Sequence, residues 1–260
     1  MLGLAGIIIV FSLMALERAL IFYLLLNRQI SFGGAFKLTS TATALNKLFF
    51  SGSGYLASSY FSRGGSLSFA EALSAFLILE GLCVLAWLIT GIFWGTQLAL
   101  RIPAALIFAA AAVLLVFLFR RDKFISAARQ LISALKTMGP RVPLVLPLVA
   151  LDMVLFVGYY RFLLEFFKVC LPVAGIVKII AVSFTAGYFS PTPAGLGFRD
   201  AGLVFMLVKQ SIPAVVALSI ALADRVITMV FWAGLGLLTG FDVIKEEVRR
   251  RFKKPAAKAV

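Results

Sequence analysis

The stretch FSPTPAGLGFRD, residues 189–200, interrupts a long apolar tract in the second half of the chain. Its prolines, Pro191 and Pro193, lack the backbone N–H that a continuing helix would use, and its glycines, Gly195 and Gly197, adopt backbone angles that other residues resist. A helix therefore cannot run straight through this stretch. Inside a bilayer, irregular backbone is tolerated only where protein buries it or where it lines a wet cavity. We expect an elbow between two half-helices, at the wall of a polar cavity.

The composition around this elbow is that of an integral membrane protein. The chain has 260 residues, of which 62% are hydrophobic and 14% charged, and its mean hydropathy is +1.04. Soluble domains are about half apolar and about a quarter charged. These values predict an all-α, polytopic membrane protein.

The charge is strongly basic, with 25 Lys and Arg against 11 Asp and Glu. Because the basic residues gather in loops and in a tail beside apolar runs, we expect anionic phospholipid as the partner and no nucleic acid. The chain has no His, and Cys83 and Cys170 lie alone in apolar runs. Neither a metal site nor a cofactor nor a catalytic constellation is expected, so the protein is predicted not to be an enzyme.

Apolar runs of sufficient length predict membrane spans at residues 4–26, 69–94, 103–119, 144–167 and 215–238. Two further tracts are apolar but broken. Residues 38–61 are interrupted by Asn46, Lys47 and a Gly-Ser cluster at 51–54, and residues 169–208 by the elbow. We expect each broken tract to form a helical hairpin that enters and leaves the bilayer by the same face.

Basic segments set the orientation. Residues 120–141 hold six Lys or Arg and one Asp, with apolar side chains every three or four residues, which predicts an amphipathic helix on the membrane surface. Residues 242–260 form a predicted basic tail. The excess of Lys and Arg places both segments, and hence the C-terminus, in the cytoplasm of a cell-membrane protein. The first hairpin then enters from the cytoplasm and the second from outside.

The two halves show a weak internal repeat. When Glu80 is aligned with Asp224, the glycines of the two breaks also fall opposite one another. This alignment predicts inverted repeats at about 1–94 and 142–240 within one transmembrane domain, residues 1–241, as in many transporters. Chance recurrence of small and apolar residues is the alternative. The half-helix N-termini would carry partial positive charge and attract anions.

Residues 190–200 resemble the S-P-G-G-L-G-x-R-E signature of the lysylphosphatidylglycerol synthase transmembrane-region family, a group of flippase-like membrane domains. Asp224-Arg225 resembles the acid-or-polar-then-Arg pair of that family, Glu80 matches its buried Glu, and Asn46 with residues 51–54 looks like its first elbow. The resemblance covers nearly the whole chain. It implies two re-entrant helical hairpins and a role in moving lipids, or lipid-linked head groups, between leaflets.

The chain departs from this pattern in several places. Asp200 stands where Glu is usual, Ala194 replaces a glycine, and Ser51 stands near an expected proline. Family members often begin with one more span, so we expect a short variant. Synthase members add a soluble aminoacyltransferase domain, and the segment after Phe241 is too short for one, so that activity is not expected here.

The charged residues of the second half have two interpretations. Arg199 either meets the phosphate of an anionic lipid or pairs with Asp200 or Asp224 and holds the elbow shut. Asp224 and Arg225, together with Glu80, have two interpretations as well. They either line a head-group site or a proton relay, or they form salt bridges between spans.

The first half leaves similar alternatives. Lys47 is either the cytoplasmic counterpart of Arg199 or extends to the interface. Glu17 and Arg18 are interpreted as structural partners. Three charged residues of the 144–167 span are expected near the interface, with a place along the transport path as the alternative: Asp152, Arg161 and Glu165.

We therefore predict a lipid flippase-like transporter with a polar groove between the hairpins. Its expected substrate-binding residues are Asn46, Lys47, Glu80, Gly195, Gly197, Arg199, Asp200, Asp224 and Arg225. The cations and the elbow amides would bind phosphate, and the carboxylates would meet cationic or hydroxyl groups. The alternatives are a small-molecule or ion-coupled permease, or a non-catalytic subunit that assists a lipid synthase or glycosyltransferase. The lipid, the energy source and a homo-oligomeric state are left open.

Overall fold

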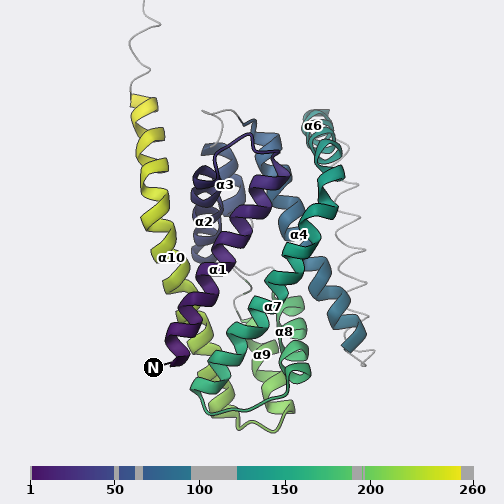
Figure 1. The fold of residues 1–260 in the computed structure, drawn as a ribbon, viewed down its shortest axis with the longest axis vertical. Helices are drawn as coiled ribbons and strands as arrows, with labels where there is room; N and C mark the ends of the chain where they lie inside the picture. Colours follow the sequence, from purple (N-terminus) through teal and green to yellow (C-terminus); the bar gives the residue numbers. More distant parts are fainter. Residues whose placement is uncertain are drawn as a thin grey trace, which may run out of the picture.

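The computed structural model describes residues 2–49, 53–61, 67–94, 122–188, 195 and 197–252, and all regular structure in them is helical. The long helices are α1 (Leu2–Leu25), α4 (Phe69–Trp94), α7 (Val142–Phe166) and α10 (Ala214–Phe252). The shorter ones are α2 (Phe32–Leu48), α3 (Ser53–Phe61), α6 (Asp122–Met138), α8 (Val173–Tyr188) and α9 (Phe198–Lys209), with a 3₁₀ turn, η2 (Gly139–Arg141), between α6 and α7 (Figure 1).

Four helical segments in the described part of the chain are long and apolar enough to cross a membrane: Gly3–Leu25, Phe69–Gly91, Ile132–Phe166 and Ala214–Gly240. Such a crossing needs about 20 residues, because a helix rises about 1.5 Å per residue and the hydrocarbon core is about 30 Å thick. The predicted all-α membrane class is confirmed. The predicted span 103–119 lies outside the described residues.

Both broken tracts are interrupted as the sequence predicts. In the first, α2 ends at Leu48 and α3 begins at Ser53. Helix α2 begins before the predicted 38–61 tract, because the Ser31 hydroxyl accepts a hydrogen bond from the Gly34 N–H at 3.1 Å and caps the helix. In the second, α8 ends at Tyr188 and α9 begins at Phe198.

The described part of the elbow shows why it needs glycine. Gly195 and Gly197 have φ values of +68° and +84°, in the region that residues with a Cβ rarely adopt. A Cβ on Gly195 would also lie 2.9 Å from the Cα of Gly187 on α8. The start of α9 is fixed by Asp200, whose Oδ2 accepts from the Gly197 N–H at 3.2 Å. The elbow thus places Arg199 in the first turn of α9.

The last helix is longer than the predicted span. Helix α10 continues to Phe252, beyond the predicted span 215–238 and into the predicted tail. Figure 1 shows α10 running beside α2 along the bundle. Residues 122–138 are helical, as predicted, and their place on the membrane surface stays a prediction.

Two apolar clusters form the core, and α1 belongs to both. Its N-terminal half contributes Phe11 and Met14 to a cluster with α7, α8, α9 and α10, and its C-terminal half contributes Ile21 and Phe22 to a cluster with α2 and α4. Helix α7 is divided in the same way, with Val149 in one cluster and Phe156 in the other. The charged residues Glu17, Arg18 and Asp152 fall between these positions. A buried polar layer therefore separates the two apolar clusters.

Close packing of α10 on α2 gives a stability prediction. A Cβ on Gly236 would collide with the Cβ of Ala44, whereas a Cβ on Gly234 would meet no atom within 4 Å. Gly236→Ala is expected to lower the free energy of unfolding by roughly 1–3 kcal/mol through overpacking. Gly234→Ala is expected to raise it by up to about 1 kcal/mol, because alanine favours helix. Thermal unfolding in detergent measures both, and equal shifts for the two variants would contradict this packing.

Candidate functional site

A cavity of about 240 Å³ lies inside the bundle and takes side chains from α1, α2, α3, α4, α7, α8, α9 and α10. Phe11, Met14, Phe156 and Phe184 supply an apolar wall from the first cluster. The polar wall holds three cations and one carboxylate: Arg18, Lys47, Arg199 and Glu80. The cavity is therefore mainly cationic at its polar side.

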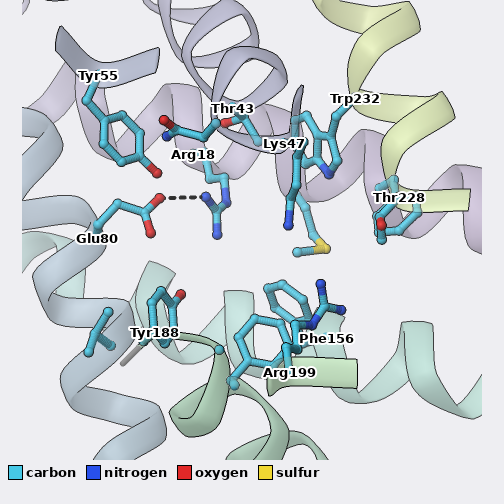
Figure 2. Close-up of a pocket in the computed structure, with 16 residues that line it drawn as sticks. Arg18, Thr43, Lys47, Tyr55, Glu80, Phe156, Tyr188, Arg199, Thr228 and Trp232 are labelled. Atoms are coloured by element: carbon cyan, nitrogen blue, oxygen red, sulfur yellow. Dashed lines mark hydrogen bonds and ion pairs between the residues drawn. The ribbon is translucent and has the colours of Figure 1, made fainter. Parts of the chain in front are cut away.

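Arg18 is the centre of one buried charge group. Its Nη1 donates to Glu80 Oε1 at 2.9 Å (Figure 2), and its Nε lies 3.6 Å from Asp152 Oδ1. The Cys83 thiol donates to the other Asp152 oxygen at 3.8 Å. This group ties α1 to α4 and α7, and it exposes Arg18 and Glu80 to the cavity.

The three charged residues of α7 lie on different faces of the helix. Asp152 is 1% exposed and lies 3.6 Å from Arg18, so it is a buried charge of the bundle, and its place near the interface stays a prediction. It occupies the same face of α7 as buried Val149 and Phe156, three and four residues away, and that periodicity was visible in the sequence. Arg161 and Glu165 lie on an exposed face, 63% and 48% accessible, and pair with one another at 3.1 Å.

Arg199 and Asp224 form the second buried pair. Arg199 Nη2 donates to Asp224 Oδ2 at 2.6 Å and to the Tyr160 hydroxyl at 3.1 Å. Asp224 Oδ1 accepts from the Tyr159 hydroxyl at 2.7 Å. The predicted alternative in which Arg199 pairs with Asp224 is confirmed. Arg199 also stands 4.8 Å above the Phe184 ring and lines the cavity.

Asp200 and Arg225, which follow Arg199 and Asp224 in the sequence, form a second salt bridge between the same two helices. Arg225 Nη2 donates to Asp200 Oδ2 at 2.7 Å. The sequence pairs Arg199-Asp200 and Asp224-Arg225 therefore cross-link α9 and α10 twice, which confirms the salt bridges proposed for Asp224 and Arg225. These two bridges fix the elbow and hold Arg199 at the cavity wall.

The break between α2 and α3 presents Lys47 to the same cavity. Asn46 Oδ1 accepts from the Gly54 N–H at 2.7 Å and joins the end of α2 to the start of α3. Lys47 points into the cavity, with Arg199 on the opposite side in Figure 2. Among the residues that the structure describes, none forms an ion pair with Lys47.

The nine residues predicted to bind substrate divide into two groups. Asn46, Lys47, Glu80 and Arg199 line the cavity. Asp200, Asp224, Arg225, Gly195 and Gly197 lie behind this lining, where they fix Arg199 and the elbow. Arg18 lines the cavity, and the sequence reasoning did not assign it to the site. Its signal was a charged pair, Glu17-Arg18, inside an apolar run.

These features define a polytopic helical membrane protein with a charged cavity between its helices. Residues 1–236 match the family described as the lysylphosphatidylglycerol synthase TM region. The chain belongs to this family, as its elbow predicts. Searches among curated proteins and among solved structures gave no match.

Proposed function

We propose that the protein moves an anionic or amino-acid-modified phospholipid, or a lipid-linked head group, between membrane leaflets. The head group passes through the cavity while the acyl chains stay in the bilayer. One observation carries the proposal: Lys47 points into a cavity inside the bundle and has no ion-pair partner among the described residues. A buried ammonium without an ion-pair partner either loses its proton or is stabilised by an anion, and a lipid phosphate would supply that anion.

The proposed path lies between two re-entrant hairpins, α2–α3 and α8–α9. Helices α3 and α9 have 9 and 12 residues, or roughly 14 and 18 Å, which is too short to cross a hydrocarbon core of about 30 Å. Figure 1 shows α2 and α3 in one half of the bundle and α8 and α9 in the other. This placement supports two inverted repeats whose breaks meet at the cavity.

Within this path, Lys47 and Arg199 would bind the phosphate, because each supplies charged N–H donors from one hairpin. Glu80 would meet the cationic or hydroxyl part of the head group. The phosphate would lie between the hairpins, so that their relative movement would expose it to either leaflet. We propose a cell-membrane location with a cytoplasmic C-terminus and a binding, non-catalytic role for these side chains.

A leaflet-exchange assay tests the proposal. Purified protein is reconstituted into vesicles that carry fluorescent phosphatidylglycerol in both leaflets, and a membrane-impermeant reductant is added outside. With the protein, the reductant is expected to bleach the label of both leaflets; without it, only the outer label. Folded protein that leaves the inner label protected for every anionic lipid tested would contradict the proposal. Uptake of a soluble anion in place of lipid exchange would indicate a permease.

A further inference from the structure

Three carboxyl groups surround Arg18: those of Glu17, Glu80 and Asp152. The Glu17 carboxyl has no hydrogen-bond donor among the described residues, and that of Asp152 has one, the Cys83 thiol on Oδ2. Glu17 and Asp152 are 4% and 1% exposed. Both Glu17 carboxylate oxygens and Oδ1 of Asp152 are buried and accept no hydrogen bond from the described residues. Buried carboxylate oxygens without a donor are strongly unfavourable, which favours a proton on one of the two acids.

Such a proton would lie between the two acids. The Glu17 and Asp152 side chains lie within hydrogen-bonding reach of one another. Two adjacent carboxyls at such a site share a proton, and the O–H of one then donates to the oxygen of the other. The charged and titratable groups that act on them are Arg18 on α1 and Glu80 and Cys83 on α4.

The charges around the cavity give the number of protons. The described cations of this region are Arg18, Lys47, Arg199 and Arg225, and the carboxyls are Glu17, Glu80, Asp152, Asp200 and Asp224. Four cations and five ionised carboxyls leave one negative charge, which a single shared proton cancels. If a phosphate adds one negative charge, a second proton restores neutrality. Burial in the bilayer favours the neutral combination in both cases.

We propose that Glu17 and Asp152 form a proton-binding site that takes up one proton for each phosphate anion bound beside Lys47. The proton comes from water, and Glu80, which lines the cavity and bonds to Arg18, is the carboxylate through which it would pass. Release of the phosphate returns the proton to water by the same route. The inference rests on the proposed function for the place of the phosphate, and it makes the head group cross together with a proton.

Calorimetry on the full chain in detergent tests this coupling. Short-chain phosphatidylglycerol and, separately, inorganic phosphate at about pH 5, where it carries one negative charge as the lipid phosphate does, are titrated in two buffers that differ in ionisation enthalpy. The difference gives the number of protons that the protein takes up. About one proton per bound phosphate is expected, with affinity rising by up to about tenfold for each unit by which pH falls.

The double variant Glu17→Gln/Asp152→Asn keeps the shape of the pair and removes its protons. It is expected to bind phosphate with no proton uptake and no dependence on pH, because the region is then positive before the anion arrives. Retained binding separates this result from misfolding. Glu165→Gln, in the exposed pair, is the control and is expected to keep the coupling. As a second readout, the infrared band of a buried protonated carboxyl should appear in the ligand-free protein and disappear in each single variant.

The outcomes separate the two proposals. Proton-free binding by the unchanged protein, coupling that survives in the double variant, or no binding of either probe would overturn the proton site. Leaflet exchange without proton uptake would leave the proposed function standing and remove this inference. Proton-coupled binding of inorganic phosphate alone, without lipid exchange, would keep the proton site and remove the lipid as its substrate.

Discussion

Asp224→Asn is expected to lower the free energy of unfolding by about 3–5 kcal/mol, because it leaves the Arg199 guanidinium buried without its counter-ion. Asp224 is 0% exposed and accepts from both Arg199 and Tyr159, so the substitution disturbs two hydrogen bonds at once. Thermal or denaturant unfolding in detergent measures the change. Functionally, the elbow would lose the contact that holds Arg199 at the cavity wall.

Two comparisons make this result specific. Glu165→Gln breaks an exposed ion pair and is expected to change the free energy of unfolding by no more than about 1 kcal/mol. Replacement of both partners, as in Arg199→Met/Asp224→Leu, is expected to recover most of the lost stability, because no buried charge remains unpaired. Equal losses for the Asp224 and Glu165 variants would contradict the buried bridge between α9 and α10.

Lys47→Gln is expected to slow leaflet exchange of an anionic lipid by roughly tenfold to a hundredfold. A charged hydrogen bond contributes about 1.5–3 kcal/mol, and each 1.4 kcal/mol is about tenfold. The same variant is expected to unfold at an equal or higher temperature, since it removes a cation that has no ion-pair partner among the described residues.

A Lys47 variant that exchanges lipid more slowly but unfolds at an equal or higher temperature indicates a binding role, because loss of a structural contact would lower both quantities. The exchange assay and thermal unfolding on the same preparations measure them, with Lys136→Gln on the exposed face of α6 as the matched control. A Lys47 variant that exchanges lipid at the unchanged rate, or that loses exchange only because it no longer folds, would contradict phosphate binding at this side chain.

The spans and breaks were predictable because their causes are local. Bilayer thickness fixes the length of an apolar helix, so α4 has the predicted bounds, Phe69–Trp94. Proline and glycine act on their own backbone, so the interruption after Tyr188 followed from the sequence as well. The extension of α10 also had a local signal, because residues 242–252 hold good helix formers and neither glycine nor proline. The basic charge of these residues instead favoured the interpretation of the segment as a tail.

The partners of the buried charges were harder to predict because they are set by packing between distant segments. Arg18 and Glu80 lie 62 positions apart, and Arg199 and Asp224 lie 25 apart. The sequence showed that such charges need partners in a bilayer, and it left open which ones they have. It also did not show that Arg18 and Lys47 face a common cavity, because that depends on how α1 and α2 turn toward the bundle.

The most direct measurement is an experimental structure of the protein in a lipid bilayer that contains phosphatidylglycerol. The account predicts head-group density inside the cavity, with the phosphate between Lys47 and Arg199 and the acyl chains leaving between the α2–α3 and α8–α9 hairpins. Lipid phosphates confined to the two membrane surfaces, with the cavity closed or occupied only by water, would contradict it.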